Sequence, residues 1–209
     1  MTRKTNLSHP RAEKRSPRQR AATERKTVGY DRTEGEEQWL TPRYITEALG
    51  RFDFDPCSPI ERPWPTARAH WTKADDGLAQ RWDGRKIGWV NPPYGSECAR
   101  WMRKAAEHGN NLLLIFSRTD TRAFHRHVWE HPNATAVFFF EGRLRFHRVD
   151  GTQGGSAGAA SVIVAYGETA KTRLVAAVGS GALLGRIVLL NDGQASVYRL
   201  GKAASGGAS

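Results

Sequence analysis

The order of the predicted elements indicates an α/β fold built around one mixed sheet. Apolar runs typical of strands alternate with segments of helical periodicity, and a cluster of strands follows toward the C-terminal end. This order predicts a sheet with a partly antiparallel end. Residues 112–116 form an uninterrupted apolar run, as expected of a central strand that is buried on both faces.

The first ordered elements are expected from Trp39 onward. Thr41-Pro42 favours a helix start, because threonine can cap and proline at the first helical position gives up no needed donor. An apolar stripe and Gly50 complete the predicted helix. Residues 52–55 alternate Phe and Asp, which predicts a strand that buries both phenylalanines and directs both carboxylates to the other face.

The middle of the chain is expected to hold a long loop, a strand and a helix. Residues 58–84 are proline-rich and polar, which predicts loop and short turns anchored by three tryptophans: Trp64, Trp71 and Trp82. Residues 87–90 predict a second strand. Ser96 is expected to cap the next helix, which Gly109 ends and whose apolar positions fall at i, i+3, i+4 and i+7: Cys98, Trp101, Met102 and Ala105.

The remaining elements complete the sheet. Thr119 or Asp120 is expected to open a helix carrying Phe124 and Val128, and three later segments predict strands: 136–140, 161–166 and 186–190. Between the first two of these, an alternating stretch places Leu144 and Phe146 inward and three arginines outward: Arg143, Arg145 and Arg148.

The charge is concentrated at the N-terminus. Residues 1–27 hold nine basic side chains against two acidic ones, a net +7 of the chain's +11. Residues 1–30 lack regularly spaced large apolar residues and are predicted to form a disordered basic tail. An anionic partner, foremost nucleic acid, is expected for such a charge, although a role in solubility alone remains open.

Several classes of protein are disfavoured. No apolar stretch approaches the roughly 18 residues of a membrane span, and the N-terminus has no apolar signal core. The two cysteines form no CxxC pair, so we expect no disulfide scaffold or zinc site and a cytoplasmic location. The histidines at 125, 127 and 131 have no accompanying acidic cluster, and no metal site is predicted.

The pentapeptide Asn91-Pro92-Pro93-Tyr94-Gly95 directly follows a predicted strand and suits one chemical task. The exocyclic amine of adenine is a poor nucleophile, and two acceptors that hold its two N–H bonds make the lone pair available. The Asn91 side-chain oxygen and the Pro92 carbonyl can be these acceptors. Pro92 and Pro93 keep them rigid, and Tyr94 offers a face on which a base can stack, worth roughly 1–3 kcal/mol.

The chain resembles the phage-type DNA N6-adenine methyltransferases, a Dam-like family of bacteriophages and prophages. The resemblance covers roughly residues 36–167 and rests on motifs in a fixed order: Glu37–Pro42, Phe52–Cys57, Asp75–Leu78, Trp89–Gly95 and Glu141–Phe146. It implies a trimmed Rossmann-like class I fold that uses S-adenosylmethionine and no metal. It further implies methyl transfer to the N6 amine of adenine in DNA, in the host bacterial cytoplasm if the protein is phage-encoded.

The same resemblance implies cofactor contacts. The Thr41-Pro42 helix start would meet the methionine carboxylate. Asp55 would accept from the methionine ammonium, and Asp53 could share that task. Asp76, with Asp75 as its rival, would accept from the adenine of the cofactor, although both can be turn-forming residues before a glycine. The sequence departs from the usual pattern, since no GxG follows the first strand and no clear acid is available for the ribose.

For the substrate, we expect DNA phosphates to bind the basic tail and the arginines of the 143–148 stretch, chiefly Arg143 and Arg145. The flipped adenine would stack on Tyr94, with Phe146 as a candidate for its other side. The expected domain plan is a methyltransferase domain over 31–168, a C-terminal extension over 169–202 and a flexible tail over 203–209. Little room remains for a recognition domain, which predicts low sequence selectivity. The alternatives are a protein glutamine or cytosine N4 as the methyl acceptor, and a catalytically inactive DNA-binding module.

Overall fold

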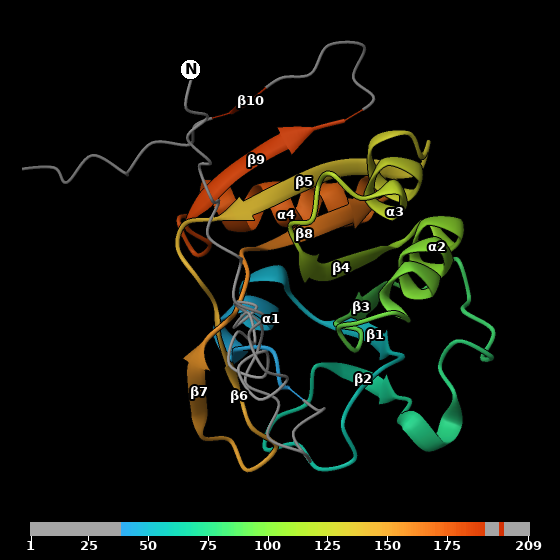
Figure 1. Ribbon diagram of the computed structural model, residues 1–209, viewed down its shortest axis with the longest axis vertical. Helices are drawn as coiled ribbons and strands as arrows, with labels where there is room; N and C mark the ends of the chain where they lie inside the picture. The colour runs from blue at the N-terminus through green and yellow to red at the C-terminus, as the bar shows by residue number, and fades with distance from the viewer. Residues whose placement is uncertain (1–38, 191–196, 199–209) are drawn as a thin grey trace, which may run out of the picture. The chain divides into compact units, whose positions relative to one another are not determined.

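The computed structural model describes residues 39–190 and the strand at 197–198, so the predicted tails 1–30 and 203–209 lie outside the described residues. Within the described residues, eight strands form one sheet in the order β10-β9-β5-β8-β4-β3-β1-β2 (Figure 1). Their bounds in chain order are β1 Phe52–Asp55, β2 Ala67–His70, β3 Gly88–Val90, β4 Asn111–Phe116, β5 Ala134–Phe140, β8 Ser161–Tyr166, β9 Gly185–Leu189 and β10 Val197–Tyr198.

The sheet has a parallel half and an antiparallel half. Strands β2, β1, β3 and β4 run parallel, whereas β8 runs antiparallel to both β4 and β5, and β9 runs antiparallel to β5. The mixed α/β sheet with an antiparallel end is therefore confirmed. A separate hairpin of β6 (Arg145–His147) and β7 (Gln153–Ser156) lies beside the sheet.

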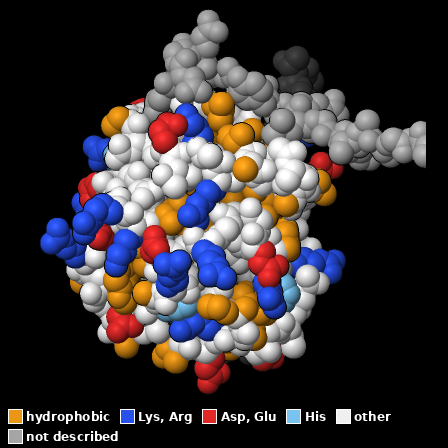
Figure 2. Space-filling model, turned by 180° about the vertical axis from the view of Figure 1, so that it is seen from behind, with side chains coloured by type: hydrophobic (Ala, Val, Ile, Leu, Met, Phe, Trp, Pro, Cys, Tyr) orange, Lys and Arg blue, Asp and Glu red, His pale blue; other side chains and the backbone are white. Residues whose placement is uncertain are grey.

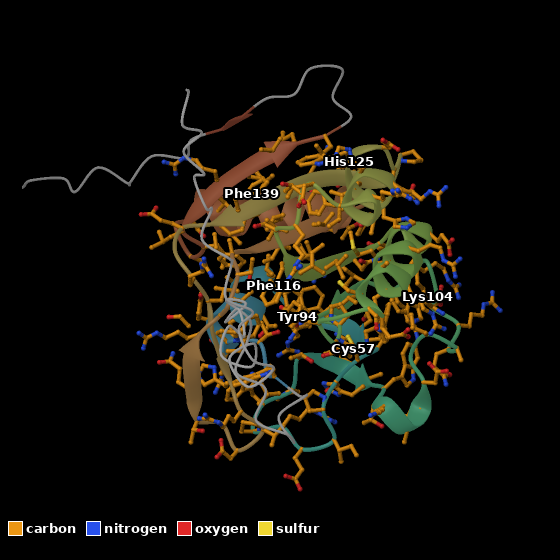
Figure 3. All side chains as sticks on the ribbon, viewed as in Figure 1. Cys57, Tyr94, Lys104, Phe116, His125 and Phe139 are labelled. Atoms are coloured by element: carbon orange, nitrogen blue, oxygen red, sulfur yellow. The ribbon has the colours of Figure 1, made fainter. Side chains whose placement is uncertain are left out.

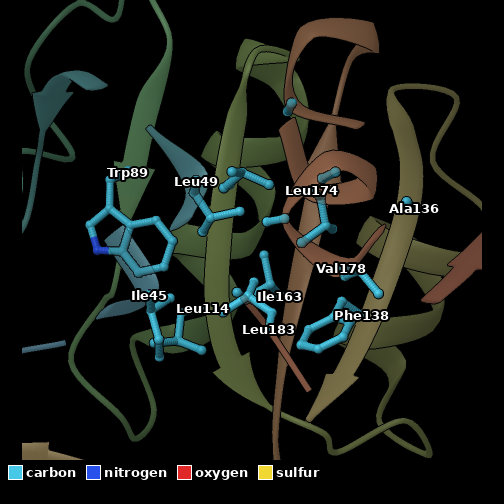
Figure 4. Packing of buried hydrophobic residues seen from close by; sticks show 14 of the residues in the cluster. Ile45, Leu49, Trp89, Leu114, Ala136, Phe138, Ile163, Leu174, Val178 and Leu183 are labelled. Carbon is cyan, nitrogen blue, oxygen red and sulfur yellow. The ribbon is translucent and has the colours of Figure 1, made fainter. Parts of the chain in front are cut away.

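Helices cover both faces of the sheet. One cluster joins α1 (Arg43–Leu49) and α4 (Glu168–Gly179) to the sheet, and Figure 4 shows Ile45 of α1 beside Leu114 and Val178 of α4 beside Phe138. The other cluster lies under α2 (Cys98–His108) and α3 (Arg122–Phe124), with the single π-helical turn His125–Trp129. Successive residues of β4 alternate between the two clusters, as expected of a central strand.

The helix starts differ from those predicted. Helix α1 begins at Arg43 with Pro42 as its N-cap, so Thr41 does not cap it. Glu97 rather than Ser96 precedes α2, and no side chain caps that helix. Thr121, not Thr119 or Asp120, caps α3 by accepting from the Phe124 amide at 3.3 Å. In each case the chain turns one or two residues later than its polar residues suggested.

The region between β1 and β3 is more regular than predicted. It contains the edge strand β2 and a 3₁₀ turn at Lys73–Asp75. Phe52 and Phe54 are both buried, but Phe52 packs with Trp89 in one cluster and Phe54 packs with Trp82 in the other, so strict alternation along β1 does not hold. Of the helices in the part of the chain that the structure describes, none is long and apolar enough to cross a membrane.

Candidate active site at the carboxyl ends of the parallel strands

The chain reverses its direction of winding between β1 and β3. From β1 it crosses to β2 on one side, and it then returns to β3 on the other side of β1. Ligands of open α/β sheets bind at such a switch point, outside the carboxyl ends of the strands. Asp55 is the last residue of β1 and Asn91 is the first residue after β3, so the two flank this point.

A small cavity lies at the switch point. It is lined by eight residues from four segments of the chain: Trp39, Leu40, Thr41, Asp55, Cys57, Pro59, Thr66 and Asn91. Its volume is about 10 Å³, which is room for about one water. The structure thus brings together Thr41, Asp55 and Asn91, which the sequence analysis named separately. A ligand larger than water enters only if the walls move apart.

Asp55 is the buried charged group of this cavity, with 3 % of its surface exposed. Its carboxylate accepts hydrogen bonds from the Thr66 hydroxyl and from the Cys57 amide, the latter at 3.1 Å. Desolvation nevertheless raises the pKa of Asp55 from 3.8 to about 6, because the two hydrogen bonds only partly replace the lost water. A cationic ligand group beside this carboxylate would favour its charged form.

Asn91 is held in one orientation by the backbone of Trp39. Its Nδ2 donates to the Trp39 carbonyl at 3.2 Å. A carbonyl only accepts, so the amide nitrogen must face Trp39 and Oδ1 faces the other way. Oδ1 lies 3.4 Å from the Tyr94 hydroxyl, which is a long and weak contact. The asparagine therefore presents an oriented acceptor on the side of Tyr94.

The Asn91–Gly95 loop lies at the surface. Within the loop, Pro93 and Gly95 are exposed, Asn91 and Tyr94 are half-buried, and Pro92 is buried. The Tyr94 ring stacks on Phe116 with a centroid distance of 4.0 Å and an interplanar angle of 14° (Figure 3). Because Pro93 and Gly95 are exposed, the loop is accessible from outside rather than enclosed in the core.

Thr41 lines the cavity, but it does not cap helix α1. The Thr41 hydroxyl accepts from the Trp89 indole at 3.3 Å and is buried. Helix α1 spans seven residues, and its N-cap is a proline without an N–H. The expected anion site at the helix start therefore has fewer donors than the sequence suggested.

The other predicted acids lie outside the cavity. Asp53 accepts from the Ile87 amide at 2.9 Å and joins β1 to β3. Asp75 is exposed and accepts from the amide and hydroxyl of Thr72, at 2.7 and 2.8 Å, so it closes the 3₁₀ turn. Asp76 is exposed at the end of that turn, with a φ of 46°. Both behave as turn-forming residues, which was the alternative interpretation.

The turn that holds these two aspartates nonetheless contacts the segment that follows Asp55. Gly77 packs so closely on Pro56 that an added Cβ would lie 1.8 Å from the Pro56 carbonyl oxygen. Pro56 follows Asp55 directly, so the position of the turn and that of the buried carboxylate are linked through one residue.

The predicted arginine-rich hairpin forms and is joined to the site. Arg143 and Arg145 are exposed, while Phe146 is only 2 % exposed and makes a T-shaped contact with Tyr94, with ring centroids 6.0 Å apart. The structure thus places Phe146 inside the core, away from solvent. Backbone hydrogen bonds of 2.8 and 3.0 Å join Leu40 to His147 and tie the hairpin to the cavity wall.

A larger hollow of about 350 Å³ lies elsewhere, between α2 and the loop before β3. Its cations are held by the protein itself: Lys104 donates to the carbonyl oxygens of Leu78 and Gln80, and Arg100 pairs with Glu97 at 2.6 Å. Figure 2 shows the molecule from behind, where Lys and Arg side chains also gather, with acidic side chains among them. None of the residues that line this hollow lines the cavity at the switch point.

Four residues of this region were not singled out by the sequence analysis. Trp39 and Thr66 orient Asn91 and Asp55, Cys57 lines the cavity, and Phe116 carries Tyr94. Only Phe116 had a usable signal, because it ends the apolar run 112–116 that predicts a central strand. The described residues contain no group of three or more His, Cys, Asp or Glu placed to hold a metal ion.

A comparison with known families covers both the sheet and the site. The model of the family described as DNA N-6-adenine-methyltransferase (Dam) matches residues 30–186, which is more than half of the chain and includes every residue of the cavity. No curated protein and no solved structure gave a match. On the strength of the family match, the chain belongs to the DNA N-6-adenine-methyltransferase (Dam) family.

Proposed function

We propose that the protein transfers a methyl group from S-adenosylmethionine to the N6 amine of adenine in DNA, and that the switch-point cavity is where its donor and acceptor meet. The family supports adenine methylation in DNA. The observation that carries the assignment of residues is the convergence of Thr41, Asp55 and Asn91 on one cavity between β1 and β3.

The donor set of the cavity fits the cofactor. A buried carboxylate suits an ammonium group, and Asp55 is ionised above its pKa of about 6, so a cation there restores the interaction that burial removed. S-adenosylmethionine, when bound, supplies a methyl group already activated by its sulfonium. The remaining task of the protein is positioning, which can lower a barrier by about 7–11 kcal/mol in favourable cases.

The sheet supports a Rossmann-like class I fold. Its parallel half places the site at the carboxyl ends of β1 and β3, as in dinucleotide-binding sheets. The short β2 is the last strand on this side among the described residues, which agrees with a trimmed version of that fold.

At the acceptor, Asn91 Oδ1 and the Pro92 carbonyl hold the two N–H bonds of the adenine amine. The Trp39 carbonyl fixes the Asn91 amide so that Oδ1 is the group presented. Contact with the incoming amine replaces the long contact of Oδ1 with the Tyr94 hydroxyl. The amine nitrogen loses its proton after transfer, so a strong base is not required.

DNA phosphates are bound by exposed arginines of the hairpin, Arg143 and Arg145, and by the basic residues of 1–27. Such contacts carry no base information. Within the described residues, no separate domain is available to read base edges, which supports low sequence selectivity. The resemblance of the motifs to phage enzymes supports a phage or prophage type.

The test is incubation with labelled S-adenosylmethionine and mixed-sequence DNA, followed by digestion and mass spectrometry. We expect N6-methyladenine from the wild type and a loss of at least 10²-fold for Asn91→Ala, with cofactor binding retained. Asn110→Ala is the matched control, because Asn110 precedes β4 at the opposite edge of the sheet. N4-methylcytosine, or methylated glutamine in protein, would show that the methyl acceptor is not adenine. Cofactor binding without any methylated product would refute catalysis.

A further inference from the structure

The ring of Tyr94 stacks on that of Phe116, a residue with no role in the proposed mechanism. Phe116 and Tyr94 are nearly parallel, at 14°, with centroids 4.0 Å apart. In chain order they are 22 positions apart, and they come from neighbouring parallel strands. Their contact is therefore a product of the sheet rather than of local sequence.

The register of the strands explains why Phe116 reaches the loop. Val90, the last residue of β3, pairs with Leu113 of β4. Strand β4 continues for three more residues, so Phe116 extends beyond the end of β3 and lies beside the Asn91–Gly95 loop. Tyr94 folds back onto the ring that β4 presents there (Figure 3).

Phe116 is fixed more firmly than Tyr94. On its other side β4 pairs with β8 along its whole length, and Phe116 itself pairs with Ser161. The Ser117 amide continues this pairing by donating to the Ala160 carbonyl at 2.9 Å. Tyr94 lies on a loop, so the strand residue sets the orientation of the loop residue and not the reverse.

We propose that Phe116 is a positioning residue for the methylation reaction: its ring sets the plane of Tyr94, and through Tyr94 the plane in which the target adenine stacks. This inference rests on the proposed function. An aromatic ring has two faces, and because Phe116 covers one, a base that stacks on Tyr94 uses the other. Without Phe116, Tyr94 must be ordered when the base arrives, and that cost appears as weaker binding of DNA.

The test compares Phe116→Leu and Phe116→Tyr with Phe140→Leu. Leucine keeps an apolar side chain at position 116 but removes the ring that stacks on Tyr94, whereas tyrosine keeps a ring there. Phe140 is the matched control, because it is also half-buried at the end of a strand and its ring packs against that of Phe138. Proteins carrying 3-fluorotyrosine report the Tyr94 ring by fluorine NMR, with its line assigned from Tyr94→Phe.

We expect Phe116→Leu to move the Tyr94 line, because the ring current of Phe116 is lost, while Phe140→Leu leaves it in place. In rate measurements on mixed-sequence DNA, the KM for DNA should rise about 2- to 12-fold, the range of an aromatic pair. In Phe116→Leu the kcat should stay within twofold of the wild-type value, and the affinity for S-adenosylmethionine should not change. Phe116→Tyr should keep the wild-type KM for DNA.

An unmoved Tyr94 line in Phe116→Leu would overturn the inference, as would an equal rise in KM for Phe140→Leu. The two arms separate this inference from the proposed function. If the wild type methylates no DNA, the proposed function fails, and the position of the Tyr94 line in Phe116→Leu still decides whether Phe116 orders that ring.

Discussion

Asp55→Asn should make the protein more stable while it removes cofactor binding. The carboxylate is 3 % exposed, and burial raises its pKa from 3.8 to about 6. At 1.36 kcal/mol per pKa unit, keeping the charged form in the folded state costs about 3 kcal/mol. Asparagine has nearly the same shape and can still accept from the Cys57 amide, but it carries no charge to desolvate.

The pH dependence follows from the direction of the shift. Below pH 3.8 the carboxyl group is protonated in both states and costs nothing. Between pH 3.8 and about 6 the unfolded chain releases this proton while the folded protein keeps it, so stability falls as the pH rises. Above pH 6 the loss approaches its full value. The cost is therefore small near pH 4 and nearly complete at pH 7.

Urea unfolding followed by tryptophan fluorescence at pH 4, 5, 6 and 7 measures this effect. The free energy of unfolding of Asp55→Asn, minus that of the wild type, should grow by about 2 kcal/mol from pH 4 to pH 7. Other titrating groups are shared by both proteins and cancel in the difference. Calorimetry at pH 7 should show lost binding of S-adenosylmethionine in the variant. A difference that stays flat across these pH values would refute the buried-charge argument.

Three further changes test neighbouring contacts. Thr66→Val removes a hydroxyl that lowers the pKa of Asp55; unfolding should then become easier at pH 7, and an unchanged pH profile would contradict this. Gly77→Ala forces the turn away from Pro56 at a cost of about 2 kcal/mol, which should lower Tm by about 4–8 °C. Gly84→Ala is the control, because a Cβ there meets open space, and it should leave Tm unchanged. Arg145→Gln should reduce the slope of log affinity for DNA against log salt by about 0.9 if the arginine contacts one phosphate; an unchanged slope would exclude that contact.

Much of the sheet could be predicted because its strands are apolar and buried. Strands β4, β5 and β8 are buried along most of their length, and their sequences are nearly continuous apolar runs. Strand β2 was missed for the opposite reason. It is an edge strand with two exposed residues in its four, so Ala67–His70 carries no hydrophobic alternation to find.

The residues of the candidate site could be named from the sequence, but the residues that support them could not. Asn91 and Asp55 stand where strands end, and their residue types indicate acceptors. The burial of Asp55 could not be inferred, because its partner Thr66 directly precedes β2, the strand that the sequence analysis did not predict. The support of Tyr94 by Phe116 depends on how far β4 extends past β3, and register between strands is not written in either strand alone.

The two halves of the sheet have different tasks. Asp55 ends β1, Asn91 follows β3 and Phe116 ends β4, so three neighbouring parallel strands each deliver one group to the same edge. The antiparallel strands β8 and β5 deliver none of these groups. Strand β8 instead pairs with all six residues of β4, up to Phe116. The antiparallel end thus fixes how far β4 extends past β3, and this extension decides whether the Phe116 ring meets the Asn91–Gly95 loop.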